Sequence, residues 1–263
     1  MAQSSAQQTR KGTQMPAKGS NSVTKTFEML ELLGEFSDGI SAARAAEITG
    51  YPFSTAYRLL GGLVESGYAS FDAHSKLYTL GIEVFRLSQK VAHRRGLDGA
   101  TKDLLRELTD STGESSILSV RRGDAALTVV AVDGPQFRTT TDPGDYSPLH
   151  TSSLGQIMLA YDSDRDASIE RLDLSARTPR SITDPGQLRQ RLDEVRSRGW
   201  AGQSEENDIG MNAVAVPVLD LDGRLLAALA LAAPVFRRSL EDLVALTPEL
   251  TTTAAAIAAR LPR

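Results

Sequence analysis

Residues 41–80 read SAARAAEITG YPFSTAYRLL GGLVESGYAS FDAHSKLYTL, and this stretch decides the fold of the first part of the chain. Ser41 can cap a short helix running to Ile48, because its hydroxyl can accept a hydrogen bond from the helix start. After a tight turn, Pro52 suits the start of the next helix, where the N–H group that proline lacks would be unpaired. Apolar spacing predicts this helix over 52–65. The layout is typical of a helix-turn-helix.

The flanking segments extend this motif on both sides. Upstream, apolar residues at helical spacing predict a helix over 22–36, with Ser22 as its cap. Downstream, residues 67–71 and 76–80 read as two short strands joined by a turn, which is the β-hairpin called a wing. We therefore predict a winged helix-turn-helix over residues 21–81.

The start of the helix over 52–65 carries side chains that suit contact with DNA. Hydroxyls and free N–H groups at a helix start can hold phosphates, and an arginine can bind a guanine edge or a phosphate. A lysine in the wing can reach the neighbouring groove. The helix alone also fits an ordinary capped surface helix, and the hairpin behind it favours DNA binding. The candidate DNA-binding residues are Ser41, Ser54, Thr55, Tyr57, Arg58 and Lys76.

Charge is distributed unevenly along the chain. The net formal charge is +3 over residues 1–97 and −7 over residues 98–263, although the whole chain carries −4. A basic part joined to a larger acidic part suits a DNA-reading domain attached to a domain that does not bind DNA. A helix with one basic face is predicted as a linker over 82–97, and residues 1–20 are predicted to be a disordered tail.

The composition argues against several classes of protein. Without cysteine, the chain can form no disulfide, no catalytic thiolate and no cysteine-based zinc site, and its three histidines lack ligand spacing. There is no phosphate-binding loop, dinucleotide fingerprint or Gly-x-Ser-x-Gly elbow, so neither an enzyme nor a cofactor is expected. No apolar run is long enough for a membrane helix, so we expect no membrane partner and a cytoplasmic location.

Residues 98–263 are predicted to form a second domain that mixes helices and strands. The last two strands read as a hairpin, which favours a mainly antiparallel sheet and an α+β fold. The predicted strands are 115–120, 126–132, 212–219 and 225–232, and the predicted helices are 151–161, 184–198 and 240–261, the last broken near Pro248.

Residues 147–156, SPLHTSSLGQ, stand out in this second domain. Ser153 and Gln156 fit a capping box, and the free N–H groups at such a helix start can hold a carboxylate. Plain capping is the simpler interpretation. The acidic run at 205–208 could bind a cation, but a solvated turn is the preferred interpretation.

Three segments make the chain similar to the IclR family of bacterial regulators. The first alone fits several winged-helix families, whereas the three in this order are specific. The resemblance implies a winged helix, a linker helix and a GAF-like ligand domain, assembled as homodimers or dimers of dimers, with small organic effectors. The segments are residues 51–60 with 67–68 and 78–81, residues 148–156, and residues 199–200, 205–206, 210, 215–218 and 233–234.

The resemblance also implies where an effector binds. Family members that bind small keto acids carry an acid, a thiol and two hydroxyls where this chain has Gln203 and three alanines, so we expect a larger, less polar effector, such as an aromatic acid or amide. Gln156 and Phe53 replace basic residues that are usual in the family. The implied effector contacts are Ser153, Leu154, Gln203, Met211, Ala213, Ala230 and Ala232.

Two functions remain open at this point. The leading hypothesis is a transcriptional regulator, with a repressor preferred to an activator, that binds operator DNA under control of an effector. The alternative is a DNA-binding regulator whose second domain only forms oligomers, which the alanine-rich pocket keeps open. An enzyme is disfavoured, because the thiol-dependent reductases among GAF-like folds need a cysteine that this chain lacks.

Overall fold

The computed structural model describes residues 21–97, 99–138 and 141–261, so the predicted tail at 1–20 lies outside the described residues. The chain divides into two compact units, Met1–Ser88 and Gln89–Arg263. The division falls inside helix α4, Ile82–Arg94, which coincides with most of the predicted linker.

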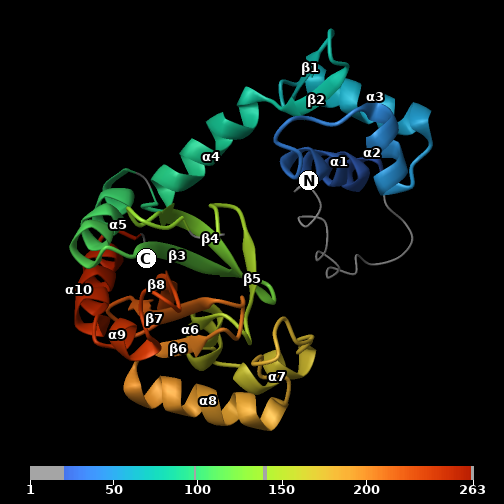
Figure 1. Ribbon diagram of the computed structural model, residues 1–263. Helices are drawn as coiled ribbons and strands as arrows, with labels where there is room; N and C mark the ends of the chain where they lie inside the picture. The colour runs from blue at the N-terminus through green and yellow to red at the C-terminus, as the bar shows by residue number, and fades with distance from the viewer. Residues whose placement is uncertain (1–20, 98, 139–140, 262–263) are drawn as a thin grey trace. The chain divides into compact units, whose positions relative to one another are not determined.

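The N-terminal unit is built from three helices and a hairpin (Figure 1). The cap of α2 is the predicted one, since the Ser41 hydroxyl accepts a hydrogen bond from the Arg44 N–H at 3.2 Å. The predicted cap of α1 was wrong: Asn21, one residue before Ser22, accepts from the N–H groups of Val23 and Thr24. The elements are α1 Ser22–Gly34, α2 Ala42–Thr49, α3 Phe53–Glu65, β1 Ala69–Asp72 and β2 Leu77–Leu80.

Apolar faces of α1, α2 and α3 meet in one core. Met29, Ala45 and Leu60 are fully buried there, and Tyr78 of β2 closes it from the hairpin side. A side chain at Gly81 would place its Cβ 2.2 Å from the Gly67 carbonyl oxygen. Only glycine therefore lets the chain leave the hairpin at this point.

The C-terminal unit is a six-stranded sheet with strand order β5-β4-β3-β8-β7-β6. All neighbouring strands are antiparallel, as predicted for an α+β fold. β5 and β6, both at sheet edges, were not predicted. The strands are β3 Ser115–Arg122, β4 Ala125–Val132, β5 Tyr146–Pro148, β6 Ala201–Ser204, β7 Met211–Leu219 and β8 Leu225–Pro234.

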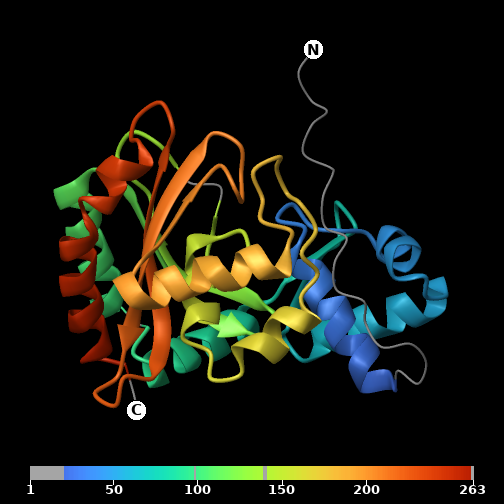
Figure 2. The same ribbon diagram turned by 90° about the horizontal axis from the view of Figure 1, so that it is seen from below.

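Helices cover both faces of this sheet (Figures 1 and 2). On one face α5, α9 and α10 pack over a core around Leu118 and Leu229, and on the other α6, α7 and α8 pack over a core around Ile157 and Leu192. The helices are α5 Gly99–Thr112, α6 Ser153–Ala160, α7 Arg165–Arg171, α8 Pro185–Arg198, α9 Leu240–Val244 and α10 Thr247–Ala258. The predicted break near Pro248 is real, but Pro248 lies in the first turn of α10, where it costs no helical hydrogen bond.

Helix α6 lies close against a sheet face made largely of alanine. Ala215 pairs with Ala230 across β7 and β8, and both are fully buried under the helix. A Cβ at Gly155 would lie 2.3 Å from the Leu149 Cα, so the first turn of α6 can rest on the preceding backbone only with glycine there. Small residues on both sides thus set the position of the α6 start.

Candidate DNA-binding and effector sites

The structure brings most of the predicted DNA-binding side chains onto one side of α3. Ser54, Tyr57 and Arg58 are exposed on this helix, and Thr55 is half-buried at its flank. Ser41 is half-buried at the start of α2, where its hydroxyl caps the helix. The exposed candidates Ser54, Tyr57 and Arg58 therefore all lie in the first two turns of α3.

The sixth candidate, Lys76, lies exposed in the turn between β1 and β2. The carboxylate of Asp72 orders this turn by accepting from the Ser75 hydroxyl at 2.6 Å and from the His74 N–H at 2.9 Å. These hydrogen bonds lower the pKa of Asp72, the Ser75 hydroxyl contributing most. The turn is therefore held in shape, and Nζ of its exposed lysine lies 5.9 Å from the centre of the Phe71 ring.

The winged helix itself is not the basic part of the chain. Residues 21–81 carry a net formal charge of −3, whereas residues 1–20 and 82–97 carry +3 each. The excess that suggested DNA binding therefore comes from the segments on either side. Within the motif, any contact with phosphates depends on a few cations, notably Arg58 and Lys76.

The seven implied effector contacts lie at the start of α6 and on strands β6, β7 and β8. Across the sheet, Gln203 pairs with Ala213, which pairs with Ala232. The Ala215–Ala230 pair lies two residues further along β7 and β8. Ser153, Leu154, Gln203 and Ala230 are buried, while Met211, Ala213 and Ala232 are half-exposed.

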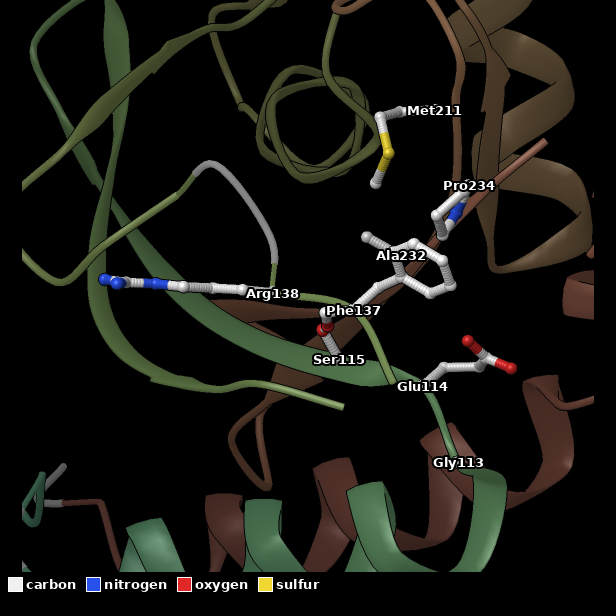
Figure 3. A pocket seen from close by; sticks show the side chains of 8 residues that line it. All are labelled: Gly113, Glu114, Ser115, Phe137, Arg138, Met211, Ala232 and Pro234. Carbon is white, nitrogen blue, oxygen red and sulfur yellow. The ribbon is translucent and has the colours of Figure 1, made fainter. Parts of the chain in front are cut away.

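A small pocket opens beside this region, with an empty volume of about 210 Å³ that includes open solvent (Figure 3). Two of the implied contacts, Met211 and Ala232, line it. Sequence reasoning missed the rest, including Phe137 and Arg138 from the loop after β4. The lining residues are Gly113, Glu114, Ser115, Phe137, Arg138, Met211, Ala232 and Pro234.

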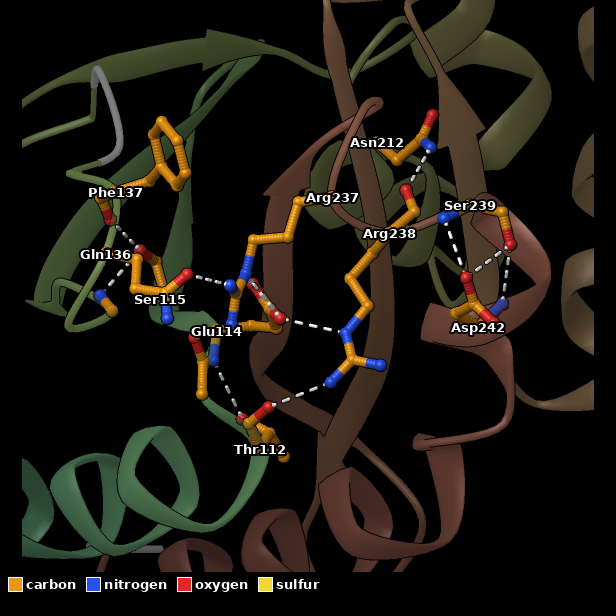
Figure 4. A network of polar contacts seen from close by, with 12 residues as sticks. Thr112, Glu114, Ser115, Gln136, Phe137, Asn212, Arg237, Arg238, Ser239 and Asp242 are labelled. Carbon is orange, nitrogen blue, oxygen red and sulfur yellow. Dashed lines mark hydrogen bonds and ion pairs between the residues drawn. The ribbon is translucent and has the colours of Figure 1, made fainter.

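A buried ionic network holds the wall of this pocket (Figure 4). Nε of Arg237 donates to both carboxylate oxygens of Glu114, each at 3.0 Å. Nε of Arg238 donates to one of these oxygens at 2.9 Å. Arg237 also donates to the side chain of Gln136. Ser115 accepts from the Gly134 N–H at 2.8 Å and donates to the Phe137 carbonyl at 3.2 Å, so the loop is tied to the start of β3.

The predicted capping box at α6 was wrong by one residue. Ser152, not Ser153, caps the helix by accepting from the Gly155 N–H at 3.0 Å. The Gln156 amide instead donates to the His150 carbonyl and to Glu206, each at 3.1 Å. Two adjacent serines offer the same chemistry, and the backbone conformation decides which of them becomes the cap.

The polar groups around α6 are largely committed to the protein itself. The Gln203 side-chain oxygen accepts from the Glu206 N–H at 2.8 Å, so this amide holds the turn that follows β6. Glu206 also pairs with Arg191 at 2.9 Å. Within the acidic run, Glu205 and Asp208 pair with arginines, and the described residues contain no group of three or more side chains that could hold a metal ion.

His150, just before α6, makes the stability of the C-terminal unit depend on pH. The residue is 2% exposed and Nε2 lies 3.1 Å from the Ser175 carbonyl oxygen. Burial lowers its pKa from the ordinary value of 6.5, against the smaller effects of this hydrogen bond and of Asp173. The unfolded chain therefore binds the proton more readily, and stability is lost as the pH falls below about 6.5.

We accordingly expect the melting temperature to fall between about pH 7.5 and pH 5.5, and to fall less in His150→Gln. Thermal unfolding followed by fluorescence of Trp200, the single tryptophan, measures this because Trp200 packs against the core of the C-terminal unit. An equal pH dependence in both proteins would show that His150 is not the titrating group.

Comparison with known proteins places both units in one family. The family model for the IclR helix-turn-helix domain matches residues 22–73, and the model for the bacterial transcriptional regulator IclR C-terminal domain matches residues 89–259. The chain belongs to the IclR family. Members of this family are DNA-binding transcriptional regulators, so the protein is a regulator and not an enzyme. The family resemblance inferred from the sequence is thereby confirmed.

Individual IclR-family proteins resemble nearly the whole chain. The HTH-type transcriptional regulator BhcR of Paracoccus denitrificans is 30% identical over 224 residues, covering 84% of this chain and 80% of its own length. The crystal structure of an IclR transcriptional regulator from Alicyclobacillus acidocaldarius covers 91% of this chain and 98% of its own, with 26% identity and a TM-score of 0.81.

A third similar structure is that of an inducer-binding domain. It is a double mutant of the PobR transcription factor inducer-binding domain from Acinetobacter, solved in complex with 3-hydroxybenzoic acid. It is 27% identical, covers 62% of this chain and 97% of its own, and has a TM-score of 0.57. Among the described residues of the present protein, none of the helices is long and apolar enough to cross a membrane.

In this IclR-family protein, two glycines in the middle of α3 have no packing role. A Cβ added at Gly61 or Gly62 would meet nothing within 4 Å. Glycine inside a helix costs about 1 kcal/mol relative to alanine, so we expect these positions to serve close approach by DNA rather than packing within the chain. We expect Gly61→Ala and Gly62→Ala each to stabilise the N-terminal unit by about 0.5–1 kcal/mol while weakening DNA binding.

Thermal unfolding and fluorescence anisotropy with labelled operator DNA measure the two effects on the same samples. Gly223→Ala serves as a control in the C-terminal unit, where the added Cβ also meets nothing but the positive φ of 76° makes the change destabilising. Stabilised variants that bind DNA as tightly as the parent would contradict the close approach.

Proposed function

We propose that the protein is an effector-controlled transcriptional repressor acting on operator DNA in the bacterial cytoplasm. In this proposal residues 21–81 read the DNA, residues 82–97 link the units, and residues 98–263 bind the effector and form the oligomer. The exposed face of α3, with Ser54, Tyr57 and Arg58 together at the helix start, is the observation that carries the DNA-reading role. A helix start of this composition suits entry into a major groove.

Homodimerisation, or assembly as a dimer of dimers, is the second part of the proposal. Exposed apolar side chains on α1 and α4 support it, namely Val23, Phe27, Ile82 and Phe85, each at least 59% exposed. Surfaces of this kind are usual at contacts between subunits. A dimer would present two α3 helices to an operator with related half-sites.

An aromatic acid or amide is the effector class that we propose. Ala213, Ala230 and Ala232 offer no side-chain hydrogen bonds to a small keto acid, and the Gln203 amide already binds the turn after β6. Arg138 lines the nearby pocket, but its guanidinium points away from it and pairs with Asp142 at 2.7 Å and Asp133 at 3.5 Å, so it would have to turn to bind a carboxylate (Figure 3). Similarity to the inducer-binding domain of PobR gives independent support for this class.

Repression is proposed because it requires no surface beyond those that bind DNA and form the dimer. A dimer bound over a promoter blocks RNA polymerase by occupancy alone, whereas an activator needs a further surface that contacts the polymerase. An effector that prefers one dimer arrangement would then release the DNA.

One observation favours the alternative, in which the C-terminal unit only forms oligomers. The pocket leaves only about 10 Å³ that the centre of a water molecule could occupy, far less than the roughly 300–1,000 Å³ of most ligand sites. Effector binding would therefore require Phe137 and its loop to move away from Ala232.

The two functions are separated by one set of experiments on the full chain. Selection of bound fragments from random DNA yields the operator, and a reporter gene behind that operator gives the direction of control. Thermal shift against benzoic acids, benzamides and small keto acids tests the effector. We expect stabilisation by an aromatic acid and none in Ala213→Leu, which fills the space but leaves α3 untouched. No response to any compound at millimolar concentration would favour the oligomerising function.

A further inference from the structure

Helix α3 carries an aromatic pair that the core does not use. Phe53 and Tyr57 stand one helical turn apart, each 57% exposed, with ring centroids 6.0 Å apart and planes inclined by 26°. Neither belongs to the core around Met29 and Leu60, whereas Leu59 and Leu60 on the opposite side of the helix are buried. Two stacked rings of this exposure leave a large apolar area in water on the face assigned to DNA.

The surroundings of the pair limit what it can recognise. Arg58 is the only cation of α3, and residues 21–81 are net negative, so attraction to phosphates supplies little of the binding energy at this face. Phe53 has no hydrogen-bonding group and can distinguish bases only by apolar contact. In the major groove the C5 methyl group of thymine is the apolar group that a base pair presents.

We propose that Phe53 and Tyr57 read thymine methyl groups in the major groove of the operator. Each half-site would then carry thymines opposite the first turn of α3, beside the base or phosphate that Arg58 contacts. This inference rests on the proposed function, because it assigns base preference to the DNA-reading face.

The spacing of the two rings matches more than one base pair. Successive base pairs are about 3.4 Å apart, so rings 6.0 Å apart span roughly two base steps. The stacked pair therefore favours two thymines within one half-site rather than a single one. Stacking also fixes the rings against each other, which reduces the entropy lost when they enter the groove.

The test replaces thymines of the selected operator, one at a time, by deoxyuridine, which removes the methyl group and keeps every hydrogen-bonding group. At the thymines that face α3 we expect about threefold to fourfold weaker binding for each methyl removed. Changing the same position in both half-sites should weaken binding about tenfold. Fluorescence anisotropy at one fixed salt concentration gives these ratios directly.

Phe53→Ala identifies the side chain responsible. The variant is expected to bind the thymine operator more weakly and to lose its sensitivity to deoxyuridine at one position in each half-site. Because Phe53 is exposed at the first residue of α3, thermal unfolding should be unchanged. Phe236→Ala, which removes a phenylalanine 74% exposed in the C-terminal unit, should keep the full sensitivity.

Each outcome decides the inference. Specific binding that no deoxyuridine weakens would overturn it and leave the proposed function standing, whereas failure to select any operator would overturn the proposed function. Equal losses in the parent and in Phe53→Ala would show that another residue reads the methyl group. Unchanged DNA binding by Phe53→Ala, with an altered oligomeric state in size-exclusion chromatography, would show that the pair contacts protein instead.

Discussion

Replacing Arg58 by alanine is expected to weaken operator binding by about 100-fold. One arginine contact to a guanine edge or a phosphate is worth about 1–3 kcal/mol, and a homodimer loses two such contacts. Arg58 is exposed, so its truncation removes nothing that the core of the N-terminal unit uses. The loss should therefore appear in DNA binding with thermal stability unchanged.

Arg58→Lys separates the two kinds of contact. Lysine keeps the charge but lacks the planar fork that binds guanine through two hydrogen bonds, so a phosphate contact would survive the change and a guanine contact would not. Arg106→Ala removes an exposed arginine from the C-terminal unit and should bind as the parent does. Unchanged affinity and specificity in Arg58→Ala would exclude the role given to this residue.

The DNA-reading unit could be predicted from the sequence because its signals are local. The Ser41 cap and the proline that precedes α3 both act within a few residues of their position. Gly50 ends α2 with a φ of +70°, a conformation that glycine adopts without strain. The error in the cap, Ser22 in place of Asn21, shifts it by one residue, and the predicted ends of α1 and β1 differ from the structure by one or two residues. Adjacent polar residues compete for a cap, and only the backbone shows which of them is used.

Some elements of the C-terminal unit lack the sequence pattern by which helices and strands are predicted. Helix α5 was not predicted, because polar residues occupy core positions along it: Thr101, Thr109 and Thr112 are buried. Each hydroxyl has a hydrogen-bond partner, such as Ser116 for Thr109, so burial costs little. Strand β6, residues 201–204, contains a glycine and no β-branched residue, and it is a strand because β7 pairs with it.

The pocket could be predicted only in part for the same reason. Positions on β7 and β8 could be carried over by resemblance, because they follow the strand register. Phe137 and Arg138 reach the pocket from a loop, and the hydrogen bonds of Ser115 that hold the loop join residues 19 and 22 positions apart. Contacts between residues this far apart in the sequence cannot be predicted from a local pattern.

Replacing Glu114 by alanine is expected to destabilise the C-terminal unit by about 3 kcal/mol. The carboxylate is 3% exposed and balances two guanidinium groups, of which Arg237 is only 21% exposed. Removing one partner of a buried ion pair costs about 3–5 kcal/mol, because the remaining charge stays buried without compensation. Arg238, at 38% exposure, can turn toward water, which puts the expected loss at the lower end.

For a unit of this size the loss corresponds to a fall of about 6–12 °C in melting temperature. Trp200 fluorescence follows the C-terminal unit in the full chain. Glu114→Gln keeps the shape and loses the charge, so it should lie between alanine and the parent. Asp103→Ala, which breaks an exposed pair with Arg106, should change stability by no more than about 0.5 kcal/mol.

The same substitution reaches the pocket in two ways, directly because Glu114 lines it and indirectly through Arg237. Because Arg237 also donates to Gln136, the residue before Phe137, loss of its carboxylate partner should loosen the loop that covers Ala232. Glu114→Ala should then change the affinity for an aromatic acid at temperatures well below its melting point, whereas Asp103→Ala should change neither property. A Glu114→Ala variant with the same melting temperature as the parent would show that the ionic network contributes no net stability. If stability falls and effector affinity is unchanged, the ionic network stabilises the fold and does not affect effector binding.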